Sequence, residues 1–212
     1  MTSEEFPEAK GSLEAEIGRI AEEGPVILLI GELSPRKGIY EMLAAARKAK
    51  ALSLDLQFVV AGPLDHSSCG EEDYPNLVSA FKNTPDNVHF RPGWIETDRE
   101  FNGAIRGCSV LWGAYRGFPF SSNLLTKAAL ANRPILVSSG GLMEKRVREF
   151  KLGLVVDPED SRAVIESLVE LARTPRESKG FETGCREYAH RNSRRRLRDV
   201  LKETLPVSSV HC

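Results

Sequence analysis

VILLIGELSPRKG, at residues 26–38, joins a continuous apolar run to a loop of glycine, proline and basic side chains. The five adjacent apolar residues, 26–30, are typical of a strand that is buried on both faces of a parallel sheet. The loop at residues 31–38 leads into a helix that we expect at residues 39–51. A buried strand, a loop and a helix in this order predict the first unit of an α/β fold.

The same unit recurs along the chain. Further apolar runs predict strands at residues 56–60, 87–90, 109–112, 134–137 and 154–156. Helices or helix-like connections are expected at residues 13–23, 77–81, from 97 onward, 124–131, 142–150, 161–173 and 177–203. About six strands, each followed by a helix, predict a doubly wound, Rossmann-like parallel sheet with helices on both faces and a long C-terminal helix.

The bulk composition excludes several classes of protein. The 212 residues carry a formal net charge of −1, which gives no electrostatic reason to expect a nucleic-acid partner. No apolar stretch is long enough for a membrane span, and the polar N-terminus is unlike a signal peptide. The four cysteines show neither disulfide nor zinc spacing, and they are Cys69, Cys108, Cys185 and Cys212. We therefore expect a cytoplasmic protein with no metal and no membrane span.

In a doubly wound sheet, ligands bind beyond the carboxyl ends of the strands, near the point where strand order reverses. The first loop at this edge, residues 31–38, carries Arg36 and Lys37 at the start of a helix, whose free N–H groups favour an anion. The alternative is a solvated basic turn in which Gly38 serves only the backbone geometry.

Two later loops at the same edge could also bind an anion. Ser122 and Asn123 precede a helix; they are good N-caps, and such a helix start also offers backbone amides to a phosphate or a sugar hydroxyl. Gly140 and Gly141 allow the backbone to approach a ligand closely, whereas Glu144 suits the helix dipole with or without a ligand. The Walker spacing and the three-glycine dinucleotide fingerprint are both missing, so nucleotide hydrolysis and nicotinamide binding lose support.

Six segments carry a family resemblance through their order and spacing. They are GxLxxxKG at residues 31–38, VVAGP at 59–63, NVHFxxGWI at 87–95, SNLL at 122–125 with RPIL at 133–136, GGxxExxV at 140–147 and GLVVxPxD at 153–160. Together these segments resemble the C-terminal domain of the retaining glycosyltransferases of group 1 (family 4, GT-B fold).

The resemblance implies a domain that binds the donor, a nucleotide-diphosphate sugar, without a cofactor or an obligatory metal. It implies that residues 25–175 form this Rossmann-like domain, between a tail with a lead-in helix at 1–24 and a C-terminal helix with a tail at 176–212. In the family, the lysine at the Lys37 position and the amides at residues 122–124 meet the diphosphate, and the loop that holds Trp94 lies near the base. The expected substrate-binding residues are Gly31, Arg36, Lys37, Trp94, Ser122, Asn123, Lys127, Gly140, Gly141 and Glu144, with no catalytic residue assigned.

The chain also departs from the family pattern. Glu32 stands where the family has an arginine, and Pro119 and Lys127 stand where it has two glutamates, so Lys127 is expected to contact phosphate instead of accepting the ribose hydroxyls. The family's acceptor-binding domain precedes this region, and residues 1–25 are too few to form it. We therefore expect the donor half of a hexosyltransferase, inactive alone and completed by a separate chain.

Two alternatives remain. The first is a non-catalytic, degenerate binding or interaction module, or a truncated gene product, which Glu32, Pro119 and Lys127 favour. The second is an unrelated doubly wound binding protein. A docking face for the missing domain is expected among the aromatic side chains of residues 115–120, and Trp112 is expected in the core because it lies within a strand.

Overall fold

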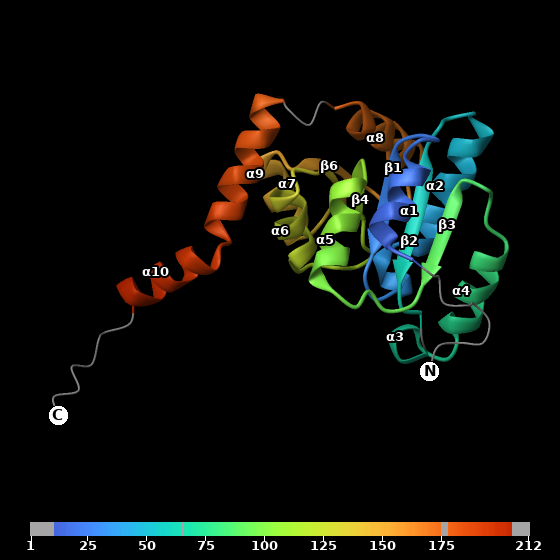
Figure 1. Cartoon of the computed structure of the whole chain (residues 1–212), viewed down its shortest axis with the longest axis horizontal. Coiled ribbons are helices and arrows are strands. Elements are labelled where there is room, and N and C mark those ends of the chain that lie inside the picture. Colours follow the sequence, from blue (N-terminus) through green and yellow to red (C-terminus); the bar gives the residue numbers. More distant parts are fainter. Residues whose placement is uncertain (1–10, 65, 175–177, 205–212) are drawn as a thin grey trace.

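The computed structural model of the chain describes residues 11–64, 66–174 and 178–204 (Figure 1). Within these residues, six strands form one sheet in the order β3-β2-β1-β4-β5-β6, and all neighbouring strands are parallel. The strands are β1 (Val26–Ile30), β2 (Gln57–Gly62), β3 (Val88–Pro92), β4 (Val110–Gly113), β5 (Ile135–Ser138) and β6 (Gly153–Val156). The expected doubly wound sheet is confirmed, and its strand order reverses between β1 and β4.

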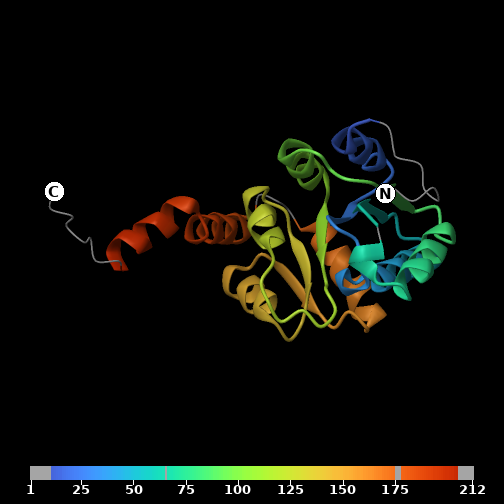
Figure 2. The same cartoon turned by 90° about the horizontal axis from the view of Figure 1, so that it is seen from below.

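Helices pack on both faces of this sheet. One face is covered by α2 (Ile39–Ala51), α4 (Asp73–Lys82) and α8 (Ser161–Arg173). The other face is covered by α1 (Leu13–Ile20), α5 (Asp98–Gly107), α6 (Asn123–Leu130), α7 (Leu142–Phe150) and α9 (Lys179–Arg191). Figure 2 shows α1 and α5 on the side of the sheet opposite α2 and α8. The remaining elements are a 3-10 turn, η1 (Pro35–Lys37), a short helix α3 (His66–Cys69), and α10 (Arg194–Thr204).

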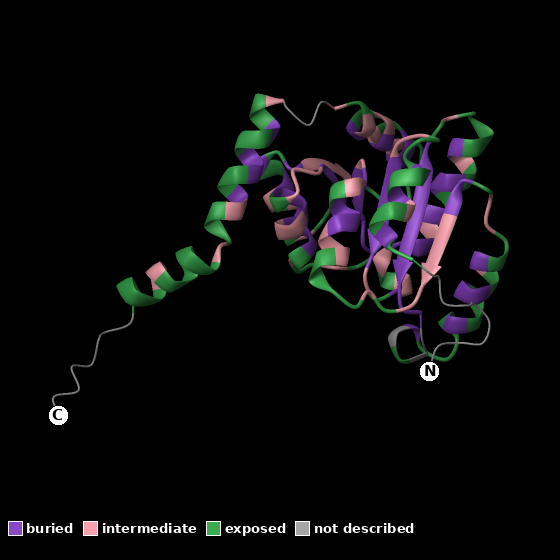
Figure 3. Cartoon of the chain, viewed as in Figure 1, coloured by how far each residue is buried: buried purple, intermediate pink, exposed green. Residues whose placement is uncertain are grey.

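Strand β1 lies at the centre of the core, which explains its continuous apolar sequence. Val26, Leu28 and Ile30 pack into the cluster beneath α1, α5 and α6, whereas Ile27 and Leu29 pack into the cluster beneath α2, α4 and α8. No residue of β1 is more than 2% exposed. Figure 3 shows the resulting pattern, in which buried strands lie between helices that are exposed on their outer sides.

Most expected boundaries agree closely with the structure, and those of β1, α2, α7 and α8 agree at both ends. The lead-in helix ends at Ile20, three residues earlier than expected, and α3 lies in a connection where no helix was expected. No helix in the described part of the chain is long and apolar enough to cross a membrane.

The C-terminal helical segment, expected as one helix over residues 177–203, consists of α9 and α10. Residue 177 lies outside the described residues. Two side chains explain the break between the two helices. Asn192 Nδ2 donates to the carbonyl oxygen of Tyr188 at 2.9 Å, and Ser193 Oγ accepts from the backbone N–H of Arg196 at 3.1 Å, which caps a new helix.

Candidate functional site

A cleft of about 440 Å³ opens at the carboxyl edge of the sheet. Its walls come from the loops that follow β1, β2 and β4, which are neighbours in the sheet. The cleft therefore lies at the reversal of strand order, where a ligand is expected in this fold. The lining residues are Glu32, Ser34, Arg36, Lys37, Ser67, Tyr115, Phe118 and Ser122.

Lys37 brings a positive charge into this cleft. Its Nζ donates to the carbonyl oxygen of Ile30 at 3.3 Å and lies 5.4 Å from the centre of the Tyr115 ring. A Cβ on Gly31 would lie only 3.1 Å from that nitrogen, so glycine leaves the space in which the ammonium lies. Burial, followed by the nearby Arg36 charge, lowers the pKa of Lys37, and Glu32 opposes this shift.

The backbone of Lys37 is fixed by the core of the sheet. The indole Nε1 of buried Trp112 donates to the carbonyl oxygen of Lys37 at 3.1 Å. Gly38 follows in the left-handed region, with φ of 73°, and a Cβ there would meet the carbonyl oxygen of Ala114 at 2.3 Å. These contacts set the direction in which α2 leaves the cleft, and Trp112 lies in the core as expected.

The loop after β4 forms the opposite wall of the cleft. Ser122 is the N-cap of α6, and its side chain accepts from the backbone N–H of Leu124 at 3.2 Å. Tyr115 is buried, which raises the pKa of its hydroxyl, and a hydrogen bond with Ser122 opposes the shift. Asn123, the first residue of α6, is exposed directly beside this wall.

Arg116 links the two walls of the cleft, which are the loops after β1 and β4. Its backbone N–H donates to the carbonyl oxygen of Arg36 at 2.8 Å. Its guanidinium pairs with the nearly buried Glu41 of α2 at 3.2 Å and with exposed Glu159 at 2.9 Å. The loops after β1 and β4 are therefore held in one arrangement, which favours a preformed cleft.

The start of α7 lies beside the rim of the cleft. A Cβ on Gly141 would lie 2.8 Å from the carbonyl oxygen of Phe118, so only glycine permits this close approach. Glu144 accepts from the backbone N–H of Gly140 at 2.6 Å and from Arg148 Nε at 2.8 Å. The bond from Gly140, followed by that from Arg148, lowers the pKa of Glu144. Gly141 thus lies beside the rim, and Gly140, Gly141 and Glu144 are not among the lining residues.

Two further expected site residues, Trp94 and Lys127, do not line the cleft. Trp94 is 74% exposed in the connection between β3 and α5. Lys127 turns toward α5, where its Nζ lies 3.1 Å from Asn102 Oδ1 and 3.3 Å from Asp98 Oδ1. The same nitrogen lies 4.5 Å from the centre of the Phe101 ring, so Lys127 has partners without a ligand.

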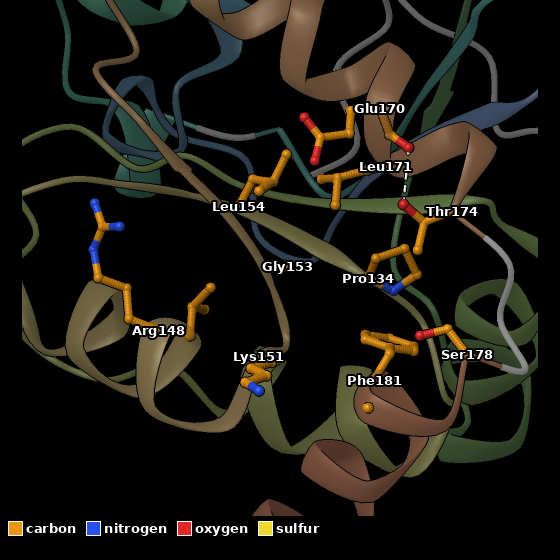
Figure 4. Close-up of a pocket in the computed structure, with 12 residues that line it drawn as sticks. Pro134, Arg148, Lys151, Gly153, Leu154, Glu170, Leu171, Thr174, Ser178 and Phe181 are labelled. Carbon is orange, nitrogen blue, oxygen red and sulfur yellow. Dashed lines mark hydrogen bonds between the residues drawn. The ribbon is translucent and has the colours of Figure 1, made fainter.

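A second hollow, of about 510 Å³, lies at the opposite edge of the sheet (Figure 4). It lies among the ends of α7 and α8, the start of α9, and Pro134 and Gly153 beside the starts of β5 and β6. Thr174 Oγ1 is bonded there to the carbonyl oxygen of Glu170 at 2.9 Å. None of the expected site residues lines this hollow.

The family comparison agrees with this architecture. The sequence model of the family described as glycosyl transferases, group 1, matches residues 24–174, which is well over half of the chain. The chain belongs to the group 1 glycosyl transferases. Among proteins of curated function, none matches the sequence significantly.

Solved structures share the fold of this group 1 domain. The C-terminal domain of LpcC, a group 1 protein from Francisella tularensis, has a TM-score of 0.56 and 17% identity, over 94% of this chain and 95% of that one. Anabaena HepE, in complex with UDP-glucose, has a TM-score of 0.66 and 16% identity, over 90% and 52%. Sucrose-phosphate synthase from Thermosynechococcus elongatus has a TM-score of 0.61 and 22% identity, over 84% and 43%. The group 1 chain thus spans about half the length of the two larger proteins.

Sequence reasoning singled out only part of the lining of the cleft in the group 1 domain. Arg36, Lys37 and Ser122 line it, with Gly31 against the Lys37 ammonium. Ser34 and Ser67 were not singled out, although Ser34 lies in the loop after β1 and Ser67 in α3, which follows β2, so both belong to the ligand-binding edge. Among the described residues, no group of three or more histidine, cysteine or acidic side chains has the arrangement of a metal site.

Proposed function

We propose that this domain binds the diphosphate of a nucleotide sugar in the cleft between β1 and β4, as the donor half of a retaining glycosyltransferase. One observation carries the proposal: the Lys37 ammonium and the start of α6 face one preformed cleft where the strand order reverses. Membership of the group 1 family supports a nucleotide-sugar ligand. The complex of HepE with UDP-glucose makes UDP-glucose the first ligand to test.

The proposed binding site for the diphosphate combines cationic side chains with backbone amides. Lys37 supplies a compact charge, and Arg36 adds a second cation on the same wall. The backbone N–H of Asn123, the first residue of α6, has no acceptor within the helix and can donate to a phosphate oxygen. The start of α7, with Gly140, Gly141 and Glu144, is proposed to border the same ligand, and Trp94 to lie near its base.

Such a binding site favours departure of the nucleoside diphosphate from the sugar. When the bond between the sugar and the diphosphate breaks, negative charge grows on the bridging oxygen, and fixed donors stabilise it without rearrangement. The sugar is then transferred, with retained stereochemistry, to an acceptor held by a second domain. We propose that this acceptor domain lies in another part of the protein or in a separate chain, and that the reaction occurs in the cytoplasm.

A second candidate function is a non-catalytic binding or interaction module. Two observations favour it: Glu32 lines the cleft, where a carboxylate repels a diphosphate, and Lys127 is occupied by Asp98 and Asn102. In this alternative the domain keeps its fold but no longer binds the nucleotide-sugar donor.

Thermal unfolding with ligands separates the two candidates. A ligand that binds only the folded domain raises its unfolding midpoint, by about 2.7 kcal/mol of added stability at a hundred times Kd. We expect a raised midpoint with at least one of UDP-glucose, GDP-mannose or ADP-glucose at millimolar concentration, and none with the free sugars. An unchanged midpoint with all three nucleotide sugars contradicts donor binding and favours the non-catalytic module.

A further inference from the structure

The two carboxylates that pair with Arg116 differ in burial. The Glu41 side chain is 10% exposed and lies 3.2 Å from the Arg116 guanidinium, whereas the Glu159 side chain is 70% exposed and lies 2.9 Å from it. An ion pair in open solvent contributes little, because water and salt screen both charges. A carboxylate that is removed from water depends on its partner, because an unpaired buried charge is strongly destabilising. Glu41 is therefore the partner that fixes the position of Arg116.

Glu41 in turn connects Arg116 to the start of α2. It lies in the first turn of that helix, four residues after Lys37. Its Oε1 faces the Arg116 guanidinium, and its buried Oε2 has no hydrogen-bond partner in the described part of the chain. Without the guanidinium, this carboxylate regains water most readily if the start of α2 moves outward. Such a movement would displace Lys37 from its place in the cleft.

The backbone beside Arg116 also reaches Lys37. The Arg116 N–H donates to the carbonyl oxygen of Arg36, the residue before Lys37, at 2.8 Å. Tyr115, the residue before Arg116, has its ring centre 5.4 Å from Lys37 Nζ. On the other side of Arg116, the Phe118 ring centre lies 5.2 Å from the Arg36 guanidinium. Displacement of Arg116 is therefore expected to move both the Lys37 backbone and the ring against which its ammonium lies.

We propose that Arg116 is a positioning residue for the diphosphate: by neutralising Glu41, it holds Lys37 and the loop after β4 in the arrangement that binds the ligand. This inference rests on the proposed function, because it concerns the same cleft. Loops that are ordered in advance lose less entropy when a ligand binds, so Arg116 adds affinity without a contact to the ligand. The alternative is a direct contact, in which Arg116 leaves both glutamates and turns toward the diphosphate.

Two carboxylate variants separate positioning from direct contact by the sign of their effect. Glu41→Ala and Glu159→Ala each remove one negative charge from the same arginine, and isothermal titration measures their affinity for UDP. A direct contact predicts higher affinity for both variants, because each releases the guanidinium and removes a charge that repels the diphosphate. Positioning predicts that Glu41→Ala lowers the affinity roughly threefold or more, and that Glu159→Ala changes it less than about twofold.

Substitutions of Arg116 complete the test. Arg116→Gln is expected to lower the affinity for UDP about tenfold, and Arg116→Lys, which keeps a charge beside Glu41, to retain most of it. Arg116→Gln with Glu41→Ala should lose no more than Arg116→Gln alone, because residues in contact do not act additively. The matched control is Arg191→Gln, which should change the affinity less than about twofold. Arg191 also pairs with two carboxylates, Glu149 at 2.9 Å and Glu187 at 3.1 Å, and none of the three lines the cleft.

Hydrogen–deuterium exchange without a ligand gives a readout that does not depend on UDP. The backbone amides of residues 31–38 and 114–122 should exchange about tenfold faster in Arg116→Gln and at the original rate in Arg191→Gln. Thermal unfolding shows which variants are folded at the temperature of the titration. Glu41→Ala and Arg116→Lys decide the question if Arg116→Gln does not fold.

Three results would overturn the proposal: higher affinity of Glu41→Ala for UDP, equal affinity of Arg116→Gln and the original chain, or unchanged exchange in both loops. Failure of the original chain to bind UDP or any nucleotide sugar is a different result, which contradicts donor binding. The exchange rates still decide in that case whether Arg116 holds the two loops together.

Discussion

Lys37 Nζ lies 3.3 Å from the carbonyl oxygen of Ile30, the last residue of β1, inside the cleft at the carboxyl edge of the sheet. This ammonium lies against a carbonyl oxygen and the face of Tyr115, and the nearby charge of Glu32 also acts on it. A buried cation in this state gains most from an anion that enters the cleft.

Replacing Lys37 should weaken binding of the diphosphate. Because charge-assisted hydrogen bonds to a phosphate are lost, Lys37→Ala is expected to lower the affinity for UDP about tenfold to a hundredfold in isothermal titration. Lys82→Ala removes the same charge from an exposed position on α4 and should leave the affinity unchanged. Equal affinities of the two variants would show that Lys37 does not contact the ligand.

Donor binding should weaken as pH rises, and the loss should begin at a lower pH than it would for a lysine with an ordinary pKa. Burial lowers the pKa of Lys37 from 10.5, and the diphosphate favours the protonated form. The affinity for UDP is therefore complete below the lowered pKa and falls as pH rises through it. Without a ligand the sign is opposite: the unfolded chain binds more protons in that pH range, so folding stability rises.

The control for this pH dependence is Lys37→Arg, which stays protonated throughout. Its affinity for UDP, measured from pH 7 to 10.5, should be flat over the interval in which the original chain loses affinity. An identical pH profile for both proteins assigns the titration to another group.

Removing the carboxylate of Glu32 should strengthen donor binding. Glu32 lines the cleft, so its charge opposes an incoming diphosphate. Glu32→Gln is expected to raise the affinity for UDP about threefold to tenfold in the same titration, whereas Glu22→Gln, at an exposed position beyond α1, should have no effect. Weaker binding by Glu32→Gln would mean that this carboxylate accepts a hydrogen bond from the ligand.

Gly38 should tolerate no side chain, because a Cβ there meets the carbonyl oxygen of Ala114 at 2.3 Å and φ is 73°. Gly38→Ala is expected to cost about 3 kcal/mol of unfolding free energy in urea denaturation. Gly117→Ala is the matched control: φ there is 54° and no atom lies within 4 Å of the new Cβ, so only the strain of about 1 kcal/mol remains. Equal losses would show that the close approach to Ala114 is not rigid.

The sequence predicted the sheet well because its inner strands β1, β2 and β4 are buried along their whole length. The run at β1 has no polar residue, and its identity as a central strand follows from that alone. The break between α9 and α10 was missed because the polar pattern continues across it, and only the side-chain bonds of Asn192 and Ser193 distinguish the two helices.

The candidate site was predicted less completely for a physical reason. Lys37 and Ser122 stand beside strand ends and helix starts, which the sequence reveals, so both were found at the cleft. The partners of Lys127 lie 25 and 29 residues earlier on α5, and no local pattern indicates that its side chain turns toward Asp98 and Asn102. Directions of long side chains depend on packing between elements that are distant in the sequence.

A crystal structure of the domain with UDP is the most direct test of the proposed diphosphate-binding site. We predict that the diphosphate lies between β1 and β4, with an oxygen about 3 Å from Lys37 Nζ and another at the backbone N–H of Asn123. Lys37 should then leave the carbonyl oxygen of Ile30. A diphosphate bound elsewhere, with Lys37 still bonded to Ile30, would contradict the proposed binding site.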